Sequence, residues 1–249
     1  MASPLIVIPA RIGASRLPRK PLADIGGEPM IVHVWRRAME ADAGDVVVAT
    51  DSQEIAEAVE KAGGRPILTS PNHPSGSDRV FEAVNLADPS GTVDIVVNLQ
   101  GDQPIFDPSL LTDCLVPLED PATDISTVAA ILTDPSKVNE PSVVKMIGTP
   151  LEREGVYRAL YFSRAAAPFG PGPLFIHIGI YAYRREALAR FVKLPPSSLE
   201  LREKLEQLRA LEAGMRIDVK QVASVPIAVD TPRDLEDARA AYKRLIGTR

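Results

Sequence analysis

The chain has 249 residues, of which 45% are hydrophobic and 24% charged, and its formal net charge is −5 at pH 7. This length suits one α/β domain, or two small ones, with a sizeable core. The acidic balance argues against nucleic-acid and membrane-surface proteins, because both need a broad basic face. The single cysteine, Cys114, cannot form an internal disulfide, and no Cys/His spacing is typical of a zinc site. With no signal peptide and no run long enough to span a membrane, we expect a cytoplasmic protein.

The first half of the chain alternates short apolar runs with amphipathic segments. Three unbroken runs rich in Val and Ile predict buried parallel strands, at residues 5–9, 45–50 and 94–99. Helical spacing of apolar residues predicts three helices, over 30–41, 52–64 and 76–87. The alternation predicts an α/β fold with a doubly wound, mainly parallel sheet.

The pattern changes after about Ser126, where β-like runs follow one another closely, at residues 125–132, 142–147, 158–164 and 175–184. This spacing predicts a more antiparallel extension. Two helices should follow, Ser198–Gly214 and Thr231–Leu245, and the second begins with a Thr-Pro pair that favours a helix start. We expect a single domain, 1–249, with a β-rich elaboration at about 126–185.

The loop from Ala10 to Pro21 follows the first predicted strand and carries four cations: Arg11, Arg16, Arg19 and Lys20. In open α/β sheets, ligands bind beyond the carboxyl ends of the strands. Backbone N–H groups around Gly13, with Arg and Lys side chains, are able to surround phosphate oxygens there. A solvated cationic turn is the alternative, but the position and length of the loop favour phosphate binding. The loop matches neither the P-loop nor the dinucleotide-binding glycine motif.

The opening "IPARIGASRLPRKPLADIGGEPMIVHV" closely resembles that of the sugar nucleotidyltransferases that activate 3-deoxy-manno-octulosonate (KDO) with CTP. Further segments in the order of that family cover nearly the whole chain, among them "TSPNHPSGSDRVFEAV", "VNLQGDQPIF", "VVKMI", "ALYFSRA" and "VDTPRDLEDAR". The opening outline is shared with CMP-sialate synthetases, whereas "HIGIYAYR" with "LEQLR" is specific to the KDO branch. The resemblance implies a Rossmann-like nucleotidyltransferase fold and a Mg²⁺-dependent homodimer. It also implies transfer of CMP to KDO, with pyrophosphate release, for lipopolysaccharide assembly.

The resemblance further implies which residues meet the triphosphate and the metal. Arg11 and Lys20 would hold the triphosphate, with Ala10, Ser15 and the loop amides helping. Asp102 and Asp230 would bind Mg²⁺, which one or two carboxylates hold together with phosphates and water. Catalysis would rest on Arg11, Lys20 and Asp102. The alternative for Asp230 is a carboxylate that merely stabilises the start of a helix.

Two further residues near the nucleotide carry over from the family, Arg79 and Gln100, as ligands of the cytosine base. Arg79 could instead pair with a carboxylate, and Gln100 could cap a turn. Arg19 stands where relatives often have glycine, and an exposed arginine without a role is the favoured interpretation.

The acceptor site is implied by the second half of the chain. Arg164 would bind the KDO carboxylate, and the sugar hydroxyls would meet four residues: His177, Tyr181, Glu206 and Gln207. His177 and Tyr181 are four residues apart, so on a strand both would face the same side. A structural histidine and a solvated helix face are the alternatives for His177 and Glu206.

Two departures from the family pattern keep other readings open. Relatives usually read Asp-Glu-Pro where this chain has Asp102-Gln103-Pro104, and the stretch from Arg164 to His177 is shorter than usual. A cytidylyltransferase for 8-amino-KDO or sialate is one alternative. A catalytically weak CTP-binding relative is another, because Gln103 removes a carboxylate beside the metal site.

Overall fold

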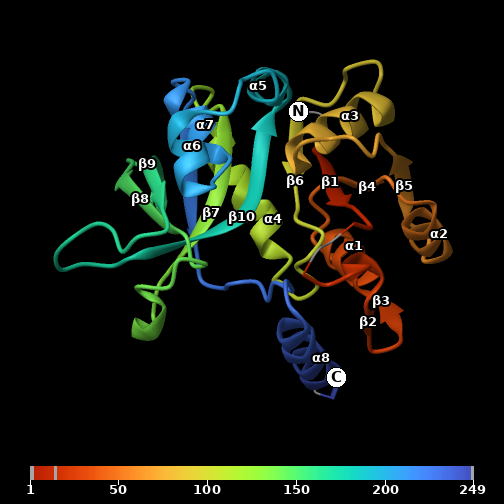
Figure 1. Cartoon of the computed structure of the whole chain (residues 1–249). Helices are drawn as coiled ribbons and strands as arrows, with labels where there is room; N and C mark the ends of the chain where they lie inside the picture. Colours follow the sequence, from red (N-terminus) through yellow and green to blue (C-terminus); the bar gives the residue numbers. More distant parts are fainter. Residues whose placement is uncertain (1–2, 14–15, 248–249) are drawn as a thin grey trace. The chain divides into compact units, whose positions relative to one another are not determined.

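The computed structural model describes residues 3–13 and 16–247, and the chain divides into two units (Figure 1). Unit 1 comprises Met1–Leu111 and Pro226–Arg249, and unit 2 comprises Thr112–Val225. Unit 2 extends beyond the β-rich elaboration expected at about 126–185. The single domain stays a prediction.

Unit 1 is built on four parallel strands in the order β5-β4-β1-β6: β1 (Leu5–Ala10), β4 (Asp45–Thr50), β5 (Arg65–Leu68) and β6 (Ile95–Asn98). The central strand β1 pairs with β4 on one side and β6 on the other, and its apolar side chains are almost wholly buried. The three predicted strands are therefore confirmed. No sequence pattern predicted β5, whose four residues include a proline and no buried side chain.

Helices connect these strands: α1 (Met30–Glu40), α2 (Gln53–Lys61) and α3 (Gly76–Ala87). Helices α1 and α2 contact each other and β4, while α3 packs against all four strands. The predicted bounds of α3 are confirmed. The Ser75 hydroxyl accepts from the Asp78 backbone N–H and caps this helix. The doubly wound form of the sheet stays a prediction.

The last helix of unit 1, α8 (Pro232–Gly247), packs against a small hairpin formed by β2 (Asp24–Ile25) and β3 (Glu28–Pro29). Their shared apolar cluster joins Ile25 and Met30 to Val229, Leu235 and Ala238. A 3₁₀ turn, η1 (Lys20–Leu22), precedes the hairpin. The cluster therefore places the residues that precede α8 close to the loop that follows β1.

Unit 2 contains five strands in the order β10-β7-β11-β9-β8: β7 (Ile125–Ile131), β8 (Lys145–Pro150), β9 (Val156–Ser163), β10 (Phe175–Arg184) and β11 (Ile217–Val222). All pairs are antiparallel except β7 with β11. The predicted antiparallel character is therefore confirmed, with β11 as an added strand. Helix α4 (Ser109–Leu115) spans the boundary between the two units, and further short elements of unit 2 are η2 (Val116–Glu119), η3 (Pro135–Lys137) and α5 (Arg185–Phe191).

One predicted helix is wrong. Instead of one helix over Ser198–Gly214, the structure has two short ones, α6 (Ser198–Glu203) and α7 (Gln207–Glu212). Lys204 ends the first in a left-handed conformation, with φ of 59°. Arg164 side-chain nitrogens donate to the carbonyls of Glu203 and Lys204, and these carbonyls would otherwise accept from the next helical turn. A contact 40 residues away in sequence thus overrides the helical pattern.

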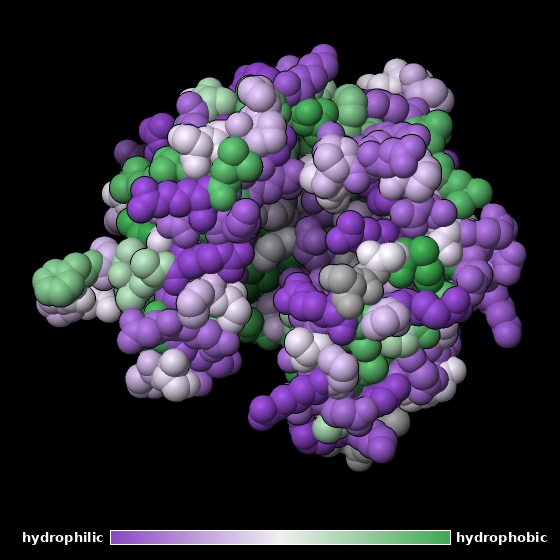
Figure 2. All heavy atoms as spheres, in the orientation of Figure 1, coloured by the Kyte–Doolittle hydropathy of each residue, from purple (hydrophilic) through white to green (hydrophobic). Residues whose placement is uncertain are grey.

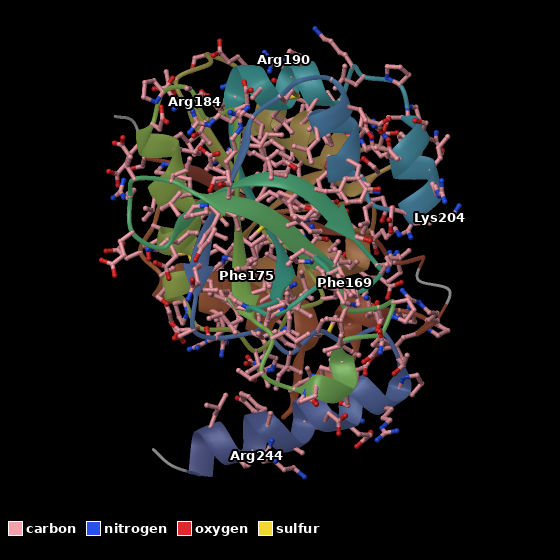
Figure 3. The ribbon with its side chains drawn as sticks, turned by 90° about the vertical axis from the view of Figure 1, so that its left-hand side faces the viewer. Phe169, Phe175, Arg184, Arg190, Lys204 and Arg244 are labelled. Atoms are coloured by element: carbon pink, nitrogen blue, oxygen red, sulfur yellow. The ribbon has the colours of Figure 1, made fainter. Side chains whose placement is uncertain are left out.

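Hydrophilic residues predominate on the face shown in Figure 2, and hydrophobic ones form small separate patches. In the loop before β10, Phe169 is fully exposed (Figure 3). No helix in the described part of the chain is both long and apolar enough to cross a membrane.

Candidate active site

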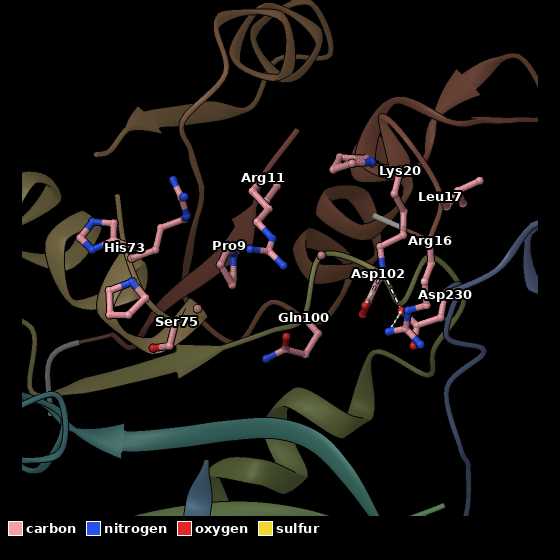
Figure 4. A pocket seen from close by; sticks show the side chains of 16 residues that line it. Pro9, Arg11, Arg16, Leu17, Lys20, His73, Ser75, Gln100, Asp102 and Asp230 are labelled. Atoms are coloured by element: carbon pink, nitrogen blue, oxygen red, sulfur yellow. Dashed lines mark hydrogen bonds and ion pairs between the residues drawn. The ribbon is translucent and has the colours of Figure 1, made fainter. Parts of the chain in front are cut away.

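A pocket of about 350 Å³ lies in unit 1, where β1 and β6 end and α3 begins (Figure 4). Its lining comes from three loops of unit 1 and from the residues just before α8: Pro9–Arg11, Arg16, Leu17, Lys20, Pro21, His73–Gly76, Arg79, Gln100–Asp102 and Asp230. The pocket therefore stands at the carboxyl edge of the parallel strands, where the sequence analysis placed it.

The cationic loop supplies one wall of this pocket. Ala10 ends β1 as a buried residue, and the exposed Arg11 directs its guanidinium into the middle of the cavity (Figure 4). The backbone N–H of Ile12 donates to Asp51 Oδ1 at 3.4 Å, which ties the loop to the end of β4. Ser15, expected to help bind the triphosphate, lies outside the described residues.

Lys20 lies between the two carboxylates predicted to hold the metal. Its Nζ donates to Asp102 Oδ2 at 2.8 Å and to Asp230 Oδ1 at 3.0 Å, and its side chain is only 16% exposed. Burial acts to lower the pKa of Lys20, but the two carboxylates outweigh it and raise that pKa. Arg16 adds a second cation, 3.3 Å from Asp230. Carboxylates and cations thus neutralise one another at this end of the pocket.

Asp230 stands just before α8, but it does not make the side-chain hydrogen bonds that cap this helix. The Thr231 hydroxyl accepts from the Asp234 N–H, and the Asp234 carboxylate accepts from the Asp230 and Thr231 N–H groups. Thr231 and Asp234 therefore cap α8 between them, and the Asp230 carboxylate is directed to Lys20 instead. The Val229 backbone N–H donates a hydrogen bond to the Asp102 carbonyl at 2.9 Å, which holds the two carboxylate-bearing segments together.

These two carboxylates fit a magnesium site that is completed by substrate. Mg²⁺ prefers oxygen ligands and commonly takes one or two carboxylates, with phosphates and water filling its octahedron. In the described ranges, no group of three or more His, Cys, Asp or Glu side chains is placed to hold a metal. Two carboxylates leave most of an octahedral shell to phosphates and water, so Asp102 and Asp230 suit a metal that arrives with a phosphorylated ligand.

Arg79 is buried, and its guanidinium is held by protein groups. It donates to Thr69 Oγ1 at 2.6 Å and to Asp51 Oδ2 at 2.9 Å, so the alternative of a carboxylate partner is what the structure shows. Gln100 lines the pocket and makes a long contact, 3.4 Å, with Asn98. Base binding by Arg79 and Gln100 stays a prediction.

His73 is a pocket residue to which the sequence analysis gave no role. Its Nε2 contacts Glu82 Oε2, and the Ser70 backbone N–H donates to the same carboxylate oxygen at 2.8 Å. Burial acts to raise the pKa of Glu82, but these partners outweigh it and lower that pKa. The only signal in the sequence was the position of His73 just ahead of "SGSDR".

Arg19 and Gln103 both stand outside the pocket lining. Arg19 is exposed, as the favoured interpretation had it. It also pairs with Glu54, and its φ of 57° explains why a glycine suits this slot. Gln103 is buried, and its Oε1 has no hydrogen-bond partner among the described residues.

The predicted acceptor residues all lie in unit 2. His177 and Tyr181, both on β10, have ring centroids 5.4 Å apart, although the strand carries a register shift between Ile178 and Tyr181. His177 Nε2 is 3.0 Å from Thr127 Oγ1, and that hydroxyl donates to the Ile180 carbonyl at 2.7 Å. Because a hydroxyl has one proton, Thr127 accepts from Nε2–H, and Nδ1 is left as an acceptor. Burial lowers the pKa of His177 to about 3, so the ring is neutral at physiological pH.

The other acceptor candidates lie at the junction of β9 with the split helix. The Arg164 guanidinium donates to three backbone carbonyls, and the Arg164 N–H donates to the Glu203 carboxylate at 2.9 Å. Glu206 is half-buried, and Gln207, the first residue of α7, is buried. Their contacts with a sugar stay predictions, as does carboxylate binding by Arg164.

Comparison with known proteins places the chain among cytidylyltransferases. The family model described as Cytidylyltransferase matches residues 5–217. A 3-deoxy-manno-octulosonate cytidylyltransferase of Methylobacterium nodulans is 61% identical over 247 residues, which cover 98% of this chain and 100% of the relative. One of Azorhizobium caulinodans is 60% identical over 236 residues, which cover 95% and 94% of the two chains.

Solved structures agree with this placement. The structure of CMP:2-keto-3-deoxy-manno-octonic acid synthetase complexed with CTP matches with a TM-score of 0.88 and 40% identity, covering 98% of this chain and 99% of the other. A 4-diphosphocytidyl-2C-methyl-D-erythritol synthase from Anaerococcus prevotii matches with a TM-score of 0.65 at 12% identity, covering 97% and 99%, which shows the fold alone. The fold is thus a mixed α/β fold of the nucleotidyltransferase type.

Proposed function

Because the chain belongs to the 3-deoxy-manno-octulosonate cytidylyltransferase family, we propose that it transfers CMP from CTP to the anomeric hydroxyl of KDO, with release of pyrophosphate. One observation of the structure supports this proposal independently of the family comparison. In a single pocket, Arg11 and Lys20 stand beside the carboxylates Asp102 and Asp230. Cations with paired carboxylates suit a magnesium–triphosphate ligand better than an uncharged one.

The cations would bind the triphosphate and stabilise the charge that develops during transfer. The acceptor hydroxyl attacks the α-phosphorus, and negative charge then builds on the phosphate oxygens and the leaving pyrophosphate. Arg11 is directed into the cavity and presents a planar fork for two oxygens, and Lys20 offers a compact charge for one. The loop that carries them would supply backbone N–H groups as further donors.

Asp102 and Asp230 would hold Mg²⁺ through their carboxylate oxygens. The metal, when bound, would neutralise charge on the phosphate oxygens. The backbone hydrogen bond between Val229 and Asp102 holds the segments that carry the two carboxylates next to each other before any ligand arrives.

The acceptor would bind to residues of unit 2. His177, neutral and held in one tautomer by Thr127, would accept from a sugar hydroxyl through Nδ1, and Tyr181 stands against its ring. Glu206 and Gln207 would meet further hydroxyls, and Arg164 would meet the carboxylate. We further propose a doubly wound sheet in unit 1, from the alternation of strands and helices, and a cytoplasmic location, from the composition of the chain. From the family resemblance we propose a homodimer and a place in lipopolysaccharide assembly.

Pyrophosphate release tests the proposal. The full chain with CTP and Mg²⁺ is offered KDO, 8-amino-KDO and N-acetylneuraminate separately. Asp102→Asn keeps the size of the side chain and removes its charge, and Asp94→Asn makes the same change at an exposed position outside the pocket. We expect release with KDO that Asp102→Asn abolishes and Asp94→Asn preserves. Release with another acid sugar alone would reassign the acceptor, and CTP binding without release would support a catalytically weak relative.

A further inference from the structure

Lys145, on β8 in unit 2, is a buried cation that the proposed chemistry does not use. Its relative exposure is 0%. The ammonium donates to two backbone carbonyls, that of Glu140 at 2.9 Å and that of Arg164 at 3.2 Å, and these are its hydrogen-bond acceptors among the described residues. Burial lowers the pKa of Lys145, because the charged form loses its hydration, and this outweighs the opposite effect of the Glu140 carboxylate. A methionine would fill this space without the desolvation cost of a buried charge, so packing alone does not account for a lysine here.

The two carbonyls that Lys145 binds belong to segments that Arg164 holds together through hydrogen bonds. The Arg164 guanidinium donates to the Pro141 carbonyl at 2.8 Å, next to the Glu140 carbonyl that Lys145 holds. Arg164 Nε donates to the Glu203 carbonyl at 2.6 Å, where α6 ends before Lys204 (Figure 3). Lys145 therefore fixes the backbone of the residue whose side chain sets the break between α6 and α7.

Lys145 also stands beside the strand that carries the other acceptor candidates. β8 pairs with β10, with Lys145 opposite Ile176, and the His177 N–H donates to the Val144 carbonyl at 2.9 Å. The segment around Lys145 thus contacts both the end of β9, which carries Arg164, and the strand of His177. The lysine is the buried cation at the meeting point of these segments.

We propose that Lys145 is a positioning residue for an acid acceptor: it fixes the backbone at Arg164 and adds positive potential there that favours a carboxylate. This inference rests on the proposed function, because it assumes that an acid sugar binds beside Arg164. The ammonium of Lys145 is shielded from solvent and bound to two carbonyls, so it acts through the backbone and through its charge. In a low-dielectric interior a unit charge acts over several ångströms with little screening.

Two substitutions separate the charge of Lys145 from its hydrogen bonds. Lys145→Met keeps the volume and removes both, whereas Lys145→Gln keeps a donor without the charge. Lys220→Met is the matched control, since Lys220 lies on β11 of the same unit and its Nζ also donates to a backbone carbonyl, that of Glu154 at 3.2 Å. Each full-length variant is assayed for KM of KDO, KM of CTP, kcat and melting temperature, and KDO binding is measured by calorimetry.

We expect Lys145→Met to raise the KM and the dissociation constant for KDO about tenfold or more, with the KM for CTP within about twofold of the wild type. Lys145→Gln should recover part of this loss, and Lys220→Met should match the wild type. The inference is overturned if the Lys145 variants match Lys220→Met. It is also overturned if both KM values rise together or the variants unfold, because Lys145 would then serve the fold alone. If the wild-type chain itself neither binds nor converts an acid sugar, the proposed function fails first, and this inference fails with it.

Discussion

Arg79 and Asp51 form a nearly buried ion pair beside the pocket of unit 1, with Arg79 Nη2 2.9 Å from Asp51 Oδ2 and side chains 5% and 12% exposed. The other Asp51 oxygen accepts from the Ile12 N–H of the cationic loop. Asp51 thus joins three segments that line or support the pocket: the loop after β1, the end of β4 and helix α3. A contact of this kind should serve both stability and nucleotide binding.

Replacing Asp51 by alanine should be costly, because it leaves the Arg79 charge buried without its partner. We expect the free energy of unfolding to fall by about 3–5 kcal/mol. The KM for CTP should also rise, since both Arg79 and the loop lose a fixed position. Urea denaturation and steady-state kinetics measure the two effects. Asp45→Ala, an exposed change at the start of the same strand, is the control. An Asp51→Ala variant as stable as that control would show that the pair contributes little.

Removing Lys20 should weaken nucleotide binding. Lys20→Met deletes an ammonium held by Asp102 and Asp230 and leaves the two carboxylates without this cation. We expect the dissociation constant for CTP to rise about 10- to 100-fold, the range for a lost hydrogen bond to a charged group. Calorimetry with CTP and Mg²⁺ checks this value. Lys61→Met, at an exposed position on α2, should leave binding unchanged. Equal affinities for the two variants would exclude Lys20 from the triphosphate site.

Arg19→Gly should not destabilise the protein, although it removes an ion pair. Arg19 has a φ of 57°, a left-handed conformation that costs a residue with a side chain about 1–2 kcal/mol. The pair with Glu54 is exposed on both sides, so solvent screens it and it contributes little to stability. We expect a free energy of unfolding that is unchanged or higher by up to about 1 kcal/mol. Glu54→Gln, which breaks the pair and keeps the backbone, isolates the second contribution. A clear loss of stability in Arg19→Gly would mean that Arg19 makes a larger contribution than its surface pair.

Local patterns in the sequence predicted the buried strands of unit 1 and helix α3, because unbroken Val/Ile runs and a Ser-capped amphipathic segment are local signals. They failed where contacts with residues distant in the sequence determine the local structure. The helical pattern of 198–214 is interrupted by donors from Arg164, and no local signal marks that contact. Among candidate site residues, the resemblance named Lys20, Asp102 and Asp230, which the fold brings into contact. It gave no hint of the particular partners of Arg79 and His73, since Asp51 follows β4 and Glu82 lies on helix α3.

His177 should make the fold sensitive to acid. Burial lowers its pKa to about 3, below the ordinary value of about 6.5, so the unfolded chain binds the proton more readily than the folded chain. The stability that neutral His177 supports is therefore present above about pH 6.5 and is lost as the pH falls from there toward about 3. In His177→Gln this proton uptake is absent. Between pH 7 and about pH 4.5 the variant should lose about 2 kcal/mol less free energy of unfolding than the wild type.

Urea denaturation of both proteins at the two pH values measures this difference directly. Comparing the losses cancels the contribution of the carboxylates, which titrate in both proteins over the same range. Thr127→Val is the companion variant, because it removes the acceptor of His177 Nε2–H and keeps the shape of the side chain. It should lower stability at pH 7 and leave the acid dependence of His177 in place. Parallel curves of the free energy of unfolding against pH for the wild type and His177→Gln would mean that the imidazole takes up its proton in the folded protein near its ordinary pKa. A neutral His177 could then not accept from a sugar hydroxyl in mild acid.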